Sequence, residues 1–361
     1  MSLLIFILIL TGLIIVHEFG HLFAAKLFGI KVEEFGIGFP PRLLSLQWGE
    51  TRYSINLLFF GGFVRIFGER KDEAGSNPRA FASKSRPKQA AVIAAGIVMN
   101  ILFAWLVLSA GYMAGLPTSA EHVGFGIVSD VHATIVGVLP DSPAKMAGLL
   151  PGDVVENIDT GTATLQQGAS SADVQAFIAE HQEESIIFTV LRDGAKEHFL
   201  AKAEVGLVAG RKAVGINLDD VGTLILPPYL ALLEGGILTY RMTLATAEGL
   251  IQFFSGLFSG AGDFADIAGP IGIAGIGSRA VANGFAAAVT LTALISINLA
   301  LLNILPIPGL DGGRLFFILI ESVVRRPLPH RLTLWFTVGG FALLIALMML
   351  VSFHDITRLI G

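Results

Sequence analysis

The sequence predicts a polytopic α-helical membrane protein with four transmembrane helices, membrane-associated β-hairpins and one inserted α+β domain. Hydrophobic residues make up 53% of the 361-residue chain, and the mean hydropathy of +0.71 is far above that of soluble domains. Four apolar stretches are long enough to cross a bilayer, which takes about 20 residues. The long segments between them are polar and carry turn signals, which indicates additional mass outside the spans.

The predicted spans cover residues 3–29, 90–115, 286–306 and 332–353. The last contains LTLWFTVGGFALLIALMMLV, which has no charged residue. The first could also be a signal peptide, but it has neither a basic segment in front nor an obvious small-residue cleavage site. We therefore expect it to be a retained span.

The polar segment 30–89 favours strands over helices. Its runs alternate between apolar and polar residues and are interrupted by glycine and proline. Together with the two flanking spans it forms the expected N-terminal region, 1–115. Apolar strands beside spans can lie at membrane depth if protein shields their backbone.

The region 116–285 is expected to contain a compact domain at 122–204 and a linker at 205–285. Within the linker, 227–260 has an amphipathic helical pattern that suits a helix on the membrane surface. A fifth span there is the competing interpretation, and its charged residues Glu234, Arg241 and Glu248 argue against it.

Charge predicts the orientation. The segment 30–89 carries ten Lys and Arg residues and 307–331 adds four more, whereas 116–285 has eight basic and nineteen acidic residues. The positive-inside rule places the two basic loops in the cytoplasm. The inserted domain and both termini are then extracytoplasmic.

Composition limits the chemistry. The chain has no cysteine, so a metal site must use His, Asp, Glu or Asn. The formal net charge is −5 and no block of basic residues occurs, so nucleic acid is not an expected partner. The expected partner is the lipid bilayer.

The stretch IIVHEFGHLF places three ionisable residues inside the first predicted span. His17 and His21 are four residues apart, so on a helix both imidazoles face the same side and can reach one zinc ion. Glu18 can reach a water bound to that ion and take its proton. This is the His-Glu-x-x-His arrangement of zinc peptidases.

Catalytic zinc usually has a third protein ligand. Asp311 is the strongest candidate, because it follows the third span in NILPIPGLDGG, where prolines break the helix. Irregular backbone at membrane depth is tolerated where it lines a cavity. His330 and His354 are weaker candidates.

These pieces resemble the site-2 protease family of zinc intramembrane proteases, in its bacterial RseP-like branch. The matching stretches are HEFGH (17–21), GGFVRIFGE (61–69), GIVMNILFA (96–104), GPIGIA (269–274) and NILPIPGLDGG (303–313), and they are distributed over nearly the whole chain.

The resemblance implies that Asp311 is the third zinc ligand and that Asn303 binds the substrate or polarises its carbonyl. Asn100 would shape the active-site cavity. The 61–69 stretch, beginning with Gly61 and Gly62, is read as a strand whose edge could pair with a substrate. The implied substrates are single-span membrane proteins, such as anti-sigma factors or signal-peptide remnants, already cut once by another protease. The implied location is a bacterial inner membrane, with the active site toward the cytoplasmic side.

The compact domain resembles a single PDZ domain. In GVLPDSPAKMAGLLPGDVVENIDTG (137–161), Ser142 is a plausible helix N-cap and Gly148 a C-cap. A second helix is expected at 171–181. Such domains bind peptides by β-augmentation, but a steric gate that excludes folded ectodomains explains the domain equally well.

Two other functions remain as alternatives. A non-catalytic PDZ scaffold would leave the residues at positions 17, 18, 21 and 311 without a task. A metal transporter would use His and Asp as translocation ligands but would need neither Glu18 as a base nor a peptide-binding domain.

Overall fold

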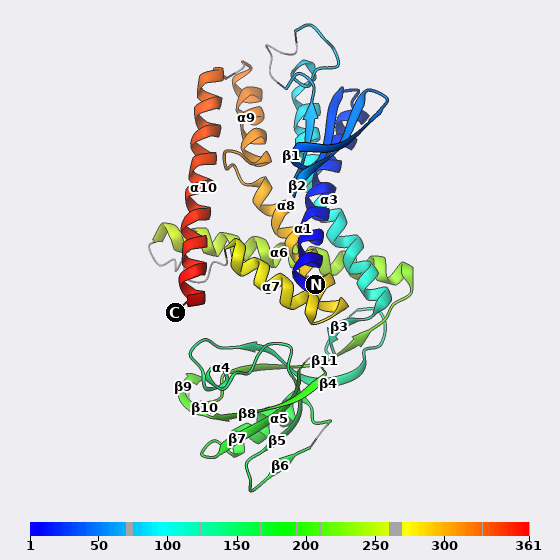
Figure 1. The fold of residues 1–361 in the computed structure, drawn as a ribbon. Coiled ribbons are helices and arrows are strands. Elements are labelled where there is room, and N and C mark those ends of the chain that lie inside the picture. Colours follow the sequence, from blue (N-terminus) through cyan, green and yellow to red (C-terminus); the bar gives the residue numbers. More distant parts are fainter. Residues whose placement is uncertain are drawn as a thin grey trace. The chain divides into compact units, whose positions relative to one another are not determined.

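The computed structural model describes residues 1–69, 75–122, 124–166, 168–192, 194–208, 211–259, 269–326 and 328–360. The chain divides into two compact units, one formed by Met1–Ser109 and Gly235–Gly361 and the other by Ala110–Glu234. The first unit is mainly helical, and the second is built on a β-sheet (Figure 1).

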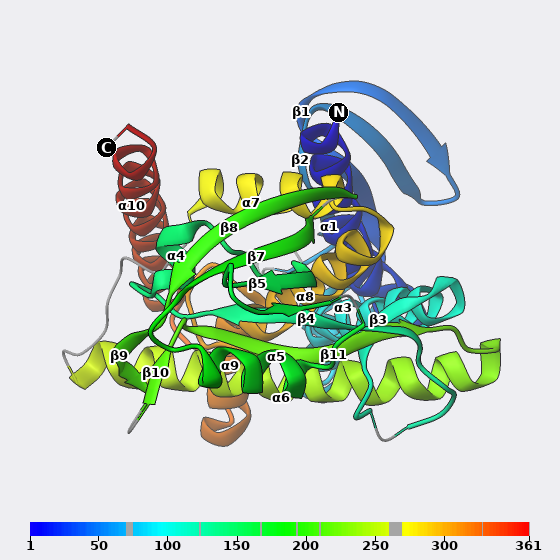
Figure 2. The same cartoon turned by 90° about the horizontal axis from the view of Figure 1, so that it is seen from below.

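The first unit contains α1 (Ser2–Leu27), β1 (Val32–Trp48), β2 (Thr51–Ile66), a 3₁₀ turn (Phe81–Ser83), most of α3 (Arg86–Ala114) and of α6 (Pro228–Ser259), α7 (Pro270–Ala282), α8 (Phe285–Ile304), α9 (Asp311–Val324) and α10 (His330–Ile360). In Figures 1 and 2, α6 and α7 run crosswise to α1 and α10. Helix α6 confirms the prediction of a helix in the segment 227–260.

Three helices among the described residues are long and apolar enough to cross a membrane: α1, α3 and α8. They correspond to the first three predicted spans. The fourth predicted span lies within α10, where the described residues provide a shorter apolar stretch, Thr333–Ala342. A fourth membrane crossing therefore stays a prediction.

Strands β1 and β2 confirm extended structure in the first part of the predicted segment 30–89, from Val32 to Ile66. The end of that segment, from Arg86, belongs to α3. The turn between Trp48 and Thr51 joins the two strands, and their pairing shifts register several times. The last part of β2 pairs with the first part of β1, from Gly62 opposite Ile37 to Ile66 opposite Val32. The first part of β2 also pairs with β1, so the first part of β1 has partners on both sides and the last part of β2 lies at an edge.

A buried carboxylate holds this sheet in register. Glu34 is 2% exposed, and its Oε1 accepts hydrogen bonds from Ser54 Oγ at 2.7 Å and Arg42 Nη2 at 2.8 Å. Burial raises the pKa of Glu34, but the Ser54 hydrogen bond and the Arg42 charge outweigh burial, so the pKa lies below its usual value.

The helix break predicted near Asp311 is present. Helix α8 ends at Ile304 and α9 begins at Asp311. Gly312 packs against the backbone of Ile304 and Leu305, and Gly313 against that of Ile307. A side chain at either glycine would collide with this backbone, so the two glycines allow the loop to fold back on the start of α9.

The C-terminal helix is tied to α7 by a buried carboxylate. Asp355 accepts hydrogen bonds from the backbone N–H groups of Gly269, at 3.1 Å, and Gly272, at 2.9 Å. These groups lie at the N-terminus of α7, where a helix has unpaired donors. The GPIGIA stretch is therefore held by residue 355, far along the chain.

The described part of the second unit contains a seven-stranded sheet, a separate two-stranded sheet of β9 and β10, and two short helices. The strand order of the larger sheet is β3-β11-β4-β5-β7-β8, with β6 on β5. Its elements are β3 (Leu116–Ser119), β4 (Ser129–Val138), α4 (Pro143–Ala147), β5 (Val154–Asp159), β6 (Thr164–Leu165), α5 (Ser171–Glu180), β7 (Ser185–Arg192), β8 (Ala195–Lys202), β9 (Glu204–Val208), β10 (Arg211–Ala213) and β11 (Ile216–Leu224).

The predicted helix signals in this unit are confirmed. Ser142 Oγ accepts from the N–H of Lys145 at 3.2 Å, and Gly148 ends α4 with φ of +95°. Helix α5 lies within the predicted 171–181 range and begins with a capping box between Ser170 and Asp173.

The sequence-based boundary of this domain, 122–204, is too narrow. Strand β11 lies in the segment 205–285 expected to be a linker, yet it is hydrogen-bonded between β3 and β4 in the middle of the sheet. The acidic pair Asp219 and Asp220 weakens the apolar pattern of this strand. Its partners are distant in sequence, so the local pattern did not reveal the pairing.

We expect Glu34→Gln to destabilise the β1–β2 sheet by about 1–3 kcal/mol at pH 7, because the cations facing residue 34 lose their anion. Since the folded-state pKa is lowered, the stabilisation is complete above the ordinary pKa of Glu, about 4.3. It is lost as pH falls through the folded-state pKa. Amide hydrogen exchange of both strands measures the effect.

Wild type and Glu34→Gln should therefore converge at low pH. Glu33→Gln is the matched control, because neighbouring strand residues face opposite sides. Equal protection of wild type and Glu34→Gln at pH 7 would contradict this account.

Candidate metal centre

Helix α1 presents His17 and His21 on one face. Their ring centroids are 4.8 Å apart, and the two Nε2 atoms are 3.2 Å apart. Both residues are buried, with exposed fractions of 9% and 8%. The four-residue spacing predicted this pairing, and the structure confirms that the imidazoles converge.

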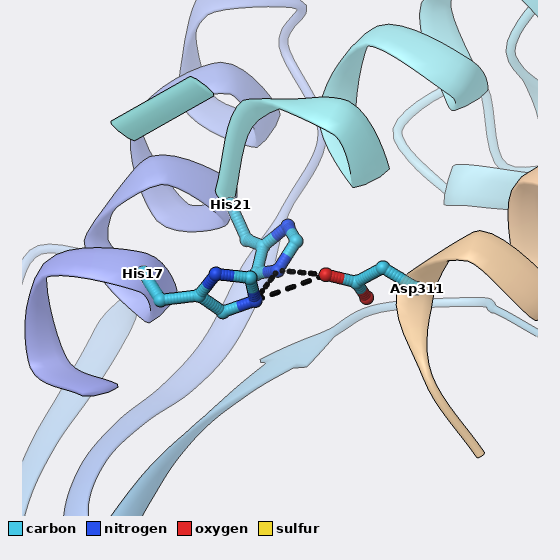
Figure 3. Close-up of side chains that lie close together, drawn as sticks. All are labelled: His17, His21 and Asp311. Carbon is cyan, nitrogen blue, oxygen red and sulfur yellow. Dashed lines mark hydrogen bonds and ion pairs between the residues drawn. The ribbon is translucent and has the colours of Figure 1, made fainter. Parts of the chain in front are cut away.

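The break between α8 and α9 brings Asp311 to the same point. Asp311 Oδ2 lies 2.9 Å from His17 Nε2 and 3.2 Å from His21 Nε2 (Figure 3). Asp311 is the first residue of α9, 290 or more positions away in sequence. Among the described residues, these three form a group that could hold a metal ion.

Glycines let α3 approach this face of α1. A methyl group at Gly96 would lie 2.6 Å from His21 Nε2 and 2.8 Å from His17 Cε1. A methyl group at Gly20 would lie 2.8 Å from the carbonyl carbon of Ala95. All three distances are far inside van der Waals contact, so each helix needs a glycine where the other crosses it.

The backbone of α3 determines the tautomer of His21. His21 Nδ1 lies 2.9 Å from the carbonyl oxygen of Val92. A carbonyl only accepts hydrogen bonds, so Nδ1 carries the proton and donates. In the neutral ring, Nε2 is then unprotonated and directed at the other two candidate ligand atoms, His17 Nε2 and Asp311 Oδ2, as metal binding requires.

Asn100 occupies the corresponding place beside His17. Its Nδ2 lies 3.4 Å from His17 Nδ1, and its Oδ1 is buried without a hydrogen-bond partner among the described residues. Ser296 Oγ donates to the Asn100 backbone carbonyl at 2.8 Å and anchors this turn of α3. A half-turn of the amide exchanges its oxygen and nitrogen, and Oδ1 can then accept a hydrogen bond from His17 Nδ1–H.

The donor set fits zinc. Ligand atoms about 2.0–2.1 Å from a tetrahedral zinc ion lie about 3.3 Å from one another. The separations of 2.9, 3.2 and 3.2 Å between the three donors need only a small expansion to admit the ion. Two imidazoles and one carboxylate are also a common ligand set of catalytic zinc.

A cavity of about 350 Å³ opens onto these residues. Glu18, Asn100 and Asn303 line it, together with Val64 from the edge of β2. The Glu18 carboxylate lies beside the Val64 backbone in this cavity. The cavity thus brings together His17, Glu18, His21, Asp311, Asn100 and Asn303, which the sequence analysis selected.

The two selected glycines of β2 differ in their positions. Gly62 faces the site, and a methyl group there would lie 3.5 Å from Glu18 Cγ. Gly61 is directed at Phe39 and has φ of +117°, a conformation that favours glycine. Gly61 is therefore a bend in the strand rather than part of the cavity wall. The weaker ligand candidates, His330 and His354, are not among the residues whose side chains the structure describes.

Sequence reasoning included Gly96 in the matching stretch 96–104 without giving it a role of its own, and it missed the Val92 carbonyl and the pair formed by Arg314 and Glu69. Arg314 Nη2 lies 3.1 Å from Glu69 Oε1, and both residues line the cavity. The Gly-x-x-x-Asn spacing from Gly96 to Asn100 was a usable signal, since residues four apart share one helix face.

Apolar helices long enough to span a membrane, with a His, His and Asp group beside a glutamate, define a membrane-embedded zinc metalloprotease. The chain belongs to Peptidase family M50, the site-2 protease family, whose model matches residues 5–347. Expectation and comparison therefore agree on family, enzyme class and metal.

Similar proteins extend over the full chain. A provisionally named zinc metalloprotease of Nostoc sp. is 33% identical over 370 residues, covering 99% of this chain and 97% of the Nostoc protein. One of Clostridium perfringens is 29% identical, with 97% of each chain covered. Zinc metalloprotease RasP of Oceanobacillus iheyensis is 27% identical, with 98% of each chain covered.

We expect Gly96→Ala to weaken zinc binding by about tenfold or more, because the added methyl group must displace both imidazoles or separate α1 from α3. Zinc per protein, measured after dialysis against a graded chelator, reports the change. Gly12→Ala is the matched control, since a methyl group at that helical glycine meets nothing within 4 Å. Equal zinc retention by both variants would contradict the close-approach argument.

We expect Asn100→Ala to weaken zinc binding by about 10–100-fold, the usual effect of removing a hydrogen-bond partner of a liganding histidine. Chelator competition measures the affinity. Ser296→Ala is the control, because it removes a hydrogen bond to the backbone of residue 100 and leaves the amide side chain in place. Equal effects of the two substitutions would show that helix packing, rather than the amide, supports His17.

Proposed function

We propose that the protein is an intramembrane endopeptidase in which His17, His21 and Asp311 hold zinc and Glu18 is the general base. The observation that carries the proposal is the convergence of these side chains, from α1 and from the start of α9, on one cavity. Ionisable groups at membrane depth are costly unless they are paired or bound to a metal. Zinc and an aqueous cavity together give all four residues a function.

The bound zinc would make a water molecule a strong nucleophile and polarise the scissile carbonyl. Glu18 takes the proton of the attacking water and returns it to the nitrogen of the departing amine. Glu18 and the backbone of Val64 lie side by side in the cavity wall. Asn303 lines the same cavity, and its amide N–H can donate to the oxyanion that develops on the carbonyl.

The edge of β2 is suited to hold the substrate in extended form. Its residues Gly62–Ile66 pair with β1 on one side. Phe63, Val64 and Ile66 line the cavity. A peptide bond inside a helix is shielded by its backbone hydrogen bonds and side chains. Pairing with the free edge of β2 would replace those hydrogen bonds as the substrate helix unwinds.

The proposed substrates are single-span membrane proteins already shortened by another protease, such as anti-sigma factors or signal-peptide remnants. The proposed location is a bacterial inner membrane, with four spans and with the second unit and both termini outside the cytoplasm. The distribution of basic residues supports this orientation. His17 and His21 lie in the second half of α1. With this orientation, we propose that the site lies toward the cytoplasmic side.

We interpret the second unit as a PDZ domain that binds peptides. Residues Ile216–Asp220 of β11 pair with β4 on one side, while β3 pairs only with Val221–Leu224. The remaining edge faces α5, and Asp220 binds the backbone N–H and hydroxyl of Ser171 at the start of that helix. An extended peptide could add to this edge.

We expect Glu18→Gln to reduce cleavage of a model single-span substrate by at least about 10²–10⁴-fold, because the amide cannot accept the proton of water. The substrate lacks its ectodomain, and the reaction is followed in proteoliposomes by gel and mass spectrometry. Zinc content is measured on wild type, Glu18→Gln and the control Glu248→Gln, which changes an exposed residue of α6.

Cleavage by wild type and the control alone, with zinc in all three, supports the proposal. Cleavage by Glu18→Gln at the wild-type rate would show that Glu18 is not the general base. No cleavage by wild type, with zinc transported into the vesicles, would favour a transporter. No cleavage and no transport would favour a scaffold.

A further inference from the structure

We propose that the recess at the end of α1 binds the phosphate headgroup of an anionic phospholipid, with an acyl chain along the adjoining groove of the β1–β2 sheet. The recess has a volume of about 400 Å³ and is lined by Lys26, Trp48, Glu50, Tyr53 and Arg79, among others. It is distinct from the catalytic cavity, with which it shares no lining residue.

Two cations, Lys26 and Arg79, line this recess, and two more, Lys31 and Lys84, lie near it. Lys26 is in the last turn of α1, and Arg79 precedes the 3₁₀ turn. The backbone N–H of Lys31 donates to the carbonyl of Arg79 at 3.1 Å, which holds these two segments together. Lys84 Nζ lies 3.9 Å from the point where a side chain at Gly29 would begin.

One carboxylate, Glu50, faces these cations. Arg79 Nη2 donates to Glu50 Oε1 at 2.5 Å. This hydrogen bond, followed by the charges of Arg79, Lys31 and Lys26, lowers the pKa of Glu50 below its usual value. Four positive charges and one negative charge leave a net charge of +3, which favours an anionic ligand.

The three lysines lack carboxylate partners among the described residues. Lys26 Nζ donates to the Tyr53 hydroxyl at 3.0 Å and lies 5.5 Å from the centre of its ring. Lys31 lies 5.3 Å from the ring of Phe67. Neutral partners leave the positive charge uncompensated, so a phosphate can still be bound without breaking an ion pair of these lysines.

The depth of the recess suits a lipid phosphate. Lys26 comes at the end of an apolar helix of 26 residues, where a membrane span reaches the headgroup layer. Trp48 is 74% exposed at the tip of the sheet. Its ring centroid lies 6.1 Å from that of Tyr53. Lysine beside tryptophan and tyrosine is the composition that proteins use at this layer.

An apolar groove continues from the recess. Tyr53 lines both the recess and a second hollow of about 330 Å³, whose other walls include Phe35, Leu44, Leu46 and Ile55. Leu44 and Leu46 are 68% and 69% exposed. A basic recess joined to an apolar groove fits an amphiphile better than a free phosphate, which would use only the recess.

The consequence concerns the position of the sheet. The β1–β2 sheet carries the Gly62–Ile66 edge beside Glu18, and Lys26 lies in the same helix as His17 and His21. A lipid bound to Lys26, Trp48 and Tyr53 connects the far end of the sheet to α1. The bound anionic lipid therefore stabilises the packing of the β1–β2 sheet against α1, the helix that carries His17 and His21.

The test uses the full-length protein in nanodiscs that contain phosphatidylglycerol and phosphatidylcholine with identical acyl chains. Lipids that stay bound after transfer to detergent are counted by native mass spectrometry. Wild type is compared with the triple variant Lys26→Gln, Lys31→Gln and Lys84→Gln. The control is Lys145→Gln, Lys196→Gln and Lys202→Gln, which removes the same charge from the second unit. Circular dichroism and zinc content verify folding.

We expect wild type and the control to retain phosphatidylglycerol in preference to phosphatidylcholine, and the triple variant to lose this preference by about tenfold or more. Equal preference in all three proteins would overturn the proposal. Release of the lipid by millimolar inorganic phosphate would also overturn it, because the recess would then be a site for free anions.

A second measurement tests the groove. The Trp48 contribution to the fluorescence is the difference between wild type and Trp48→Phe. Phosphatidylglycerol with brominated acyl chains should quench this contribution. Brominated phosphatidylcholine at the same content should quench this component less. Equal quenching by the two lipids would show that the apolar groove meets bulk lipid and does not hold an anionic one.

Discussion

The close crossing of α1 and α3 is the constraint on which the rest of the site depends. Gly20 and Gly96 allow backbone and imidazole to come together at distances that a single methyl group would prevent. The crossing supplies the Val92 carbonyl that selects the tautomer of His21, and it places Asn100 beside His17. Two glycines thus determine whether two histidines in an apolar helix can act as metal ligands, because an imidazole with its wrong nitrogen protonated cannot bind zinc.

The second constraint is the irregular backbone between α8 and α9. Prolines end the first helix, and Gly312 and Gly313 fold the chain back so that Asp311 begins the next. A carboxylate at the start of a helix is favoured by the helix dipole, which offsets part of the cost of burying it. The same residue type recurs in this fold: Asp355 accepts the first N–H groups of α7. At the start of α7 the carboxylate satisfies N–H groups that an apolar surrounding would leave unpaired.

How much could be read from the sequence depends on the distance over which each feature acts. His17, Glu18 and His21 lie within one turn and a half of helix, so their spacing sufficed, and the proline-glycine loop revealed Asp311. The helix caps Ser142 and Ser170 are likewise local. The roles of Val92 and Gly96 depend on which face of α3 meets α1, and the place of β11 depends on strands that lie far away in sequence. The register of the β1–β2 sheet depends on one buried glutamate, Glu34, which in the sequence looks like any exposed charge.

The β1–β2 sheet connects these constraints because it lines both the cavity at the candidate metal centre and the recess at the end of α1. Its edge places the Val64 backbone beside Glu18. A shift of the strand by one residue would exchange the side chains that face the cavity for those that now face away from it. Glu34 opposes such a shift from within the sheet, since it must stay near Ser54 and Arg42. Gly61 adds a bend that few other residues could adopt without strain. The position of Glu18, the proposed general base, therefore depends on the polar network inside the sheet as well as on α1.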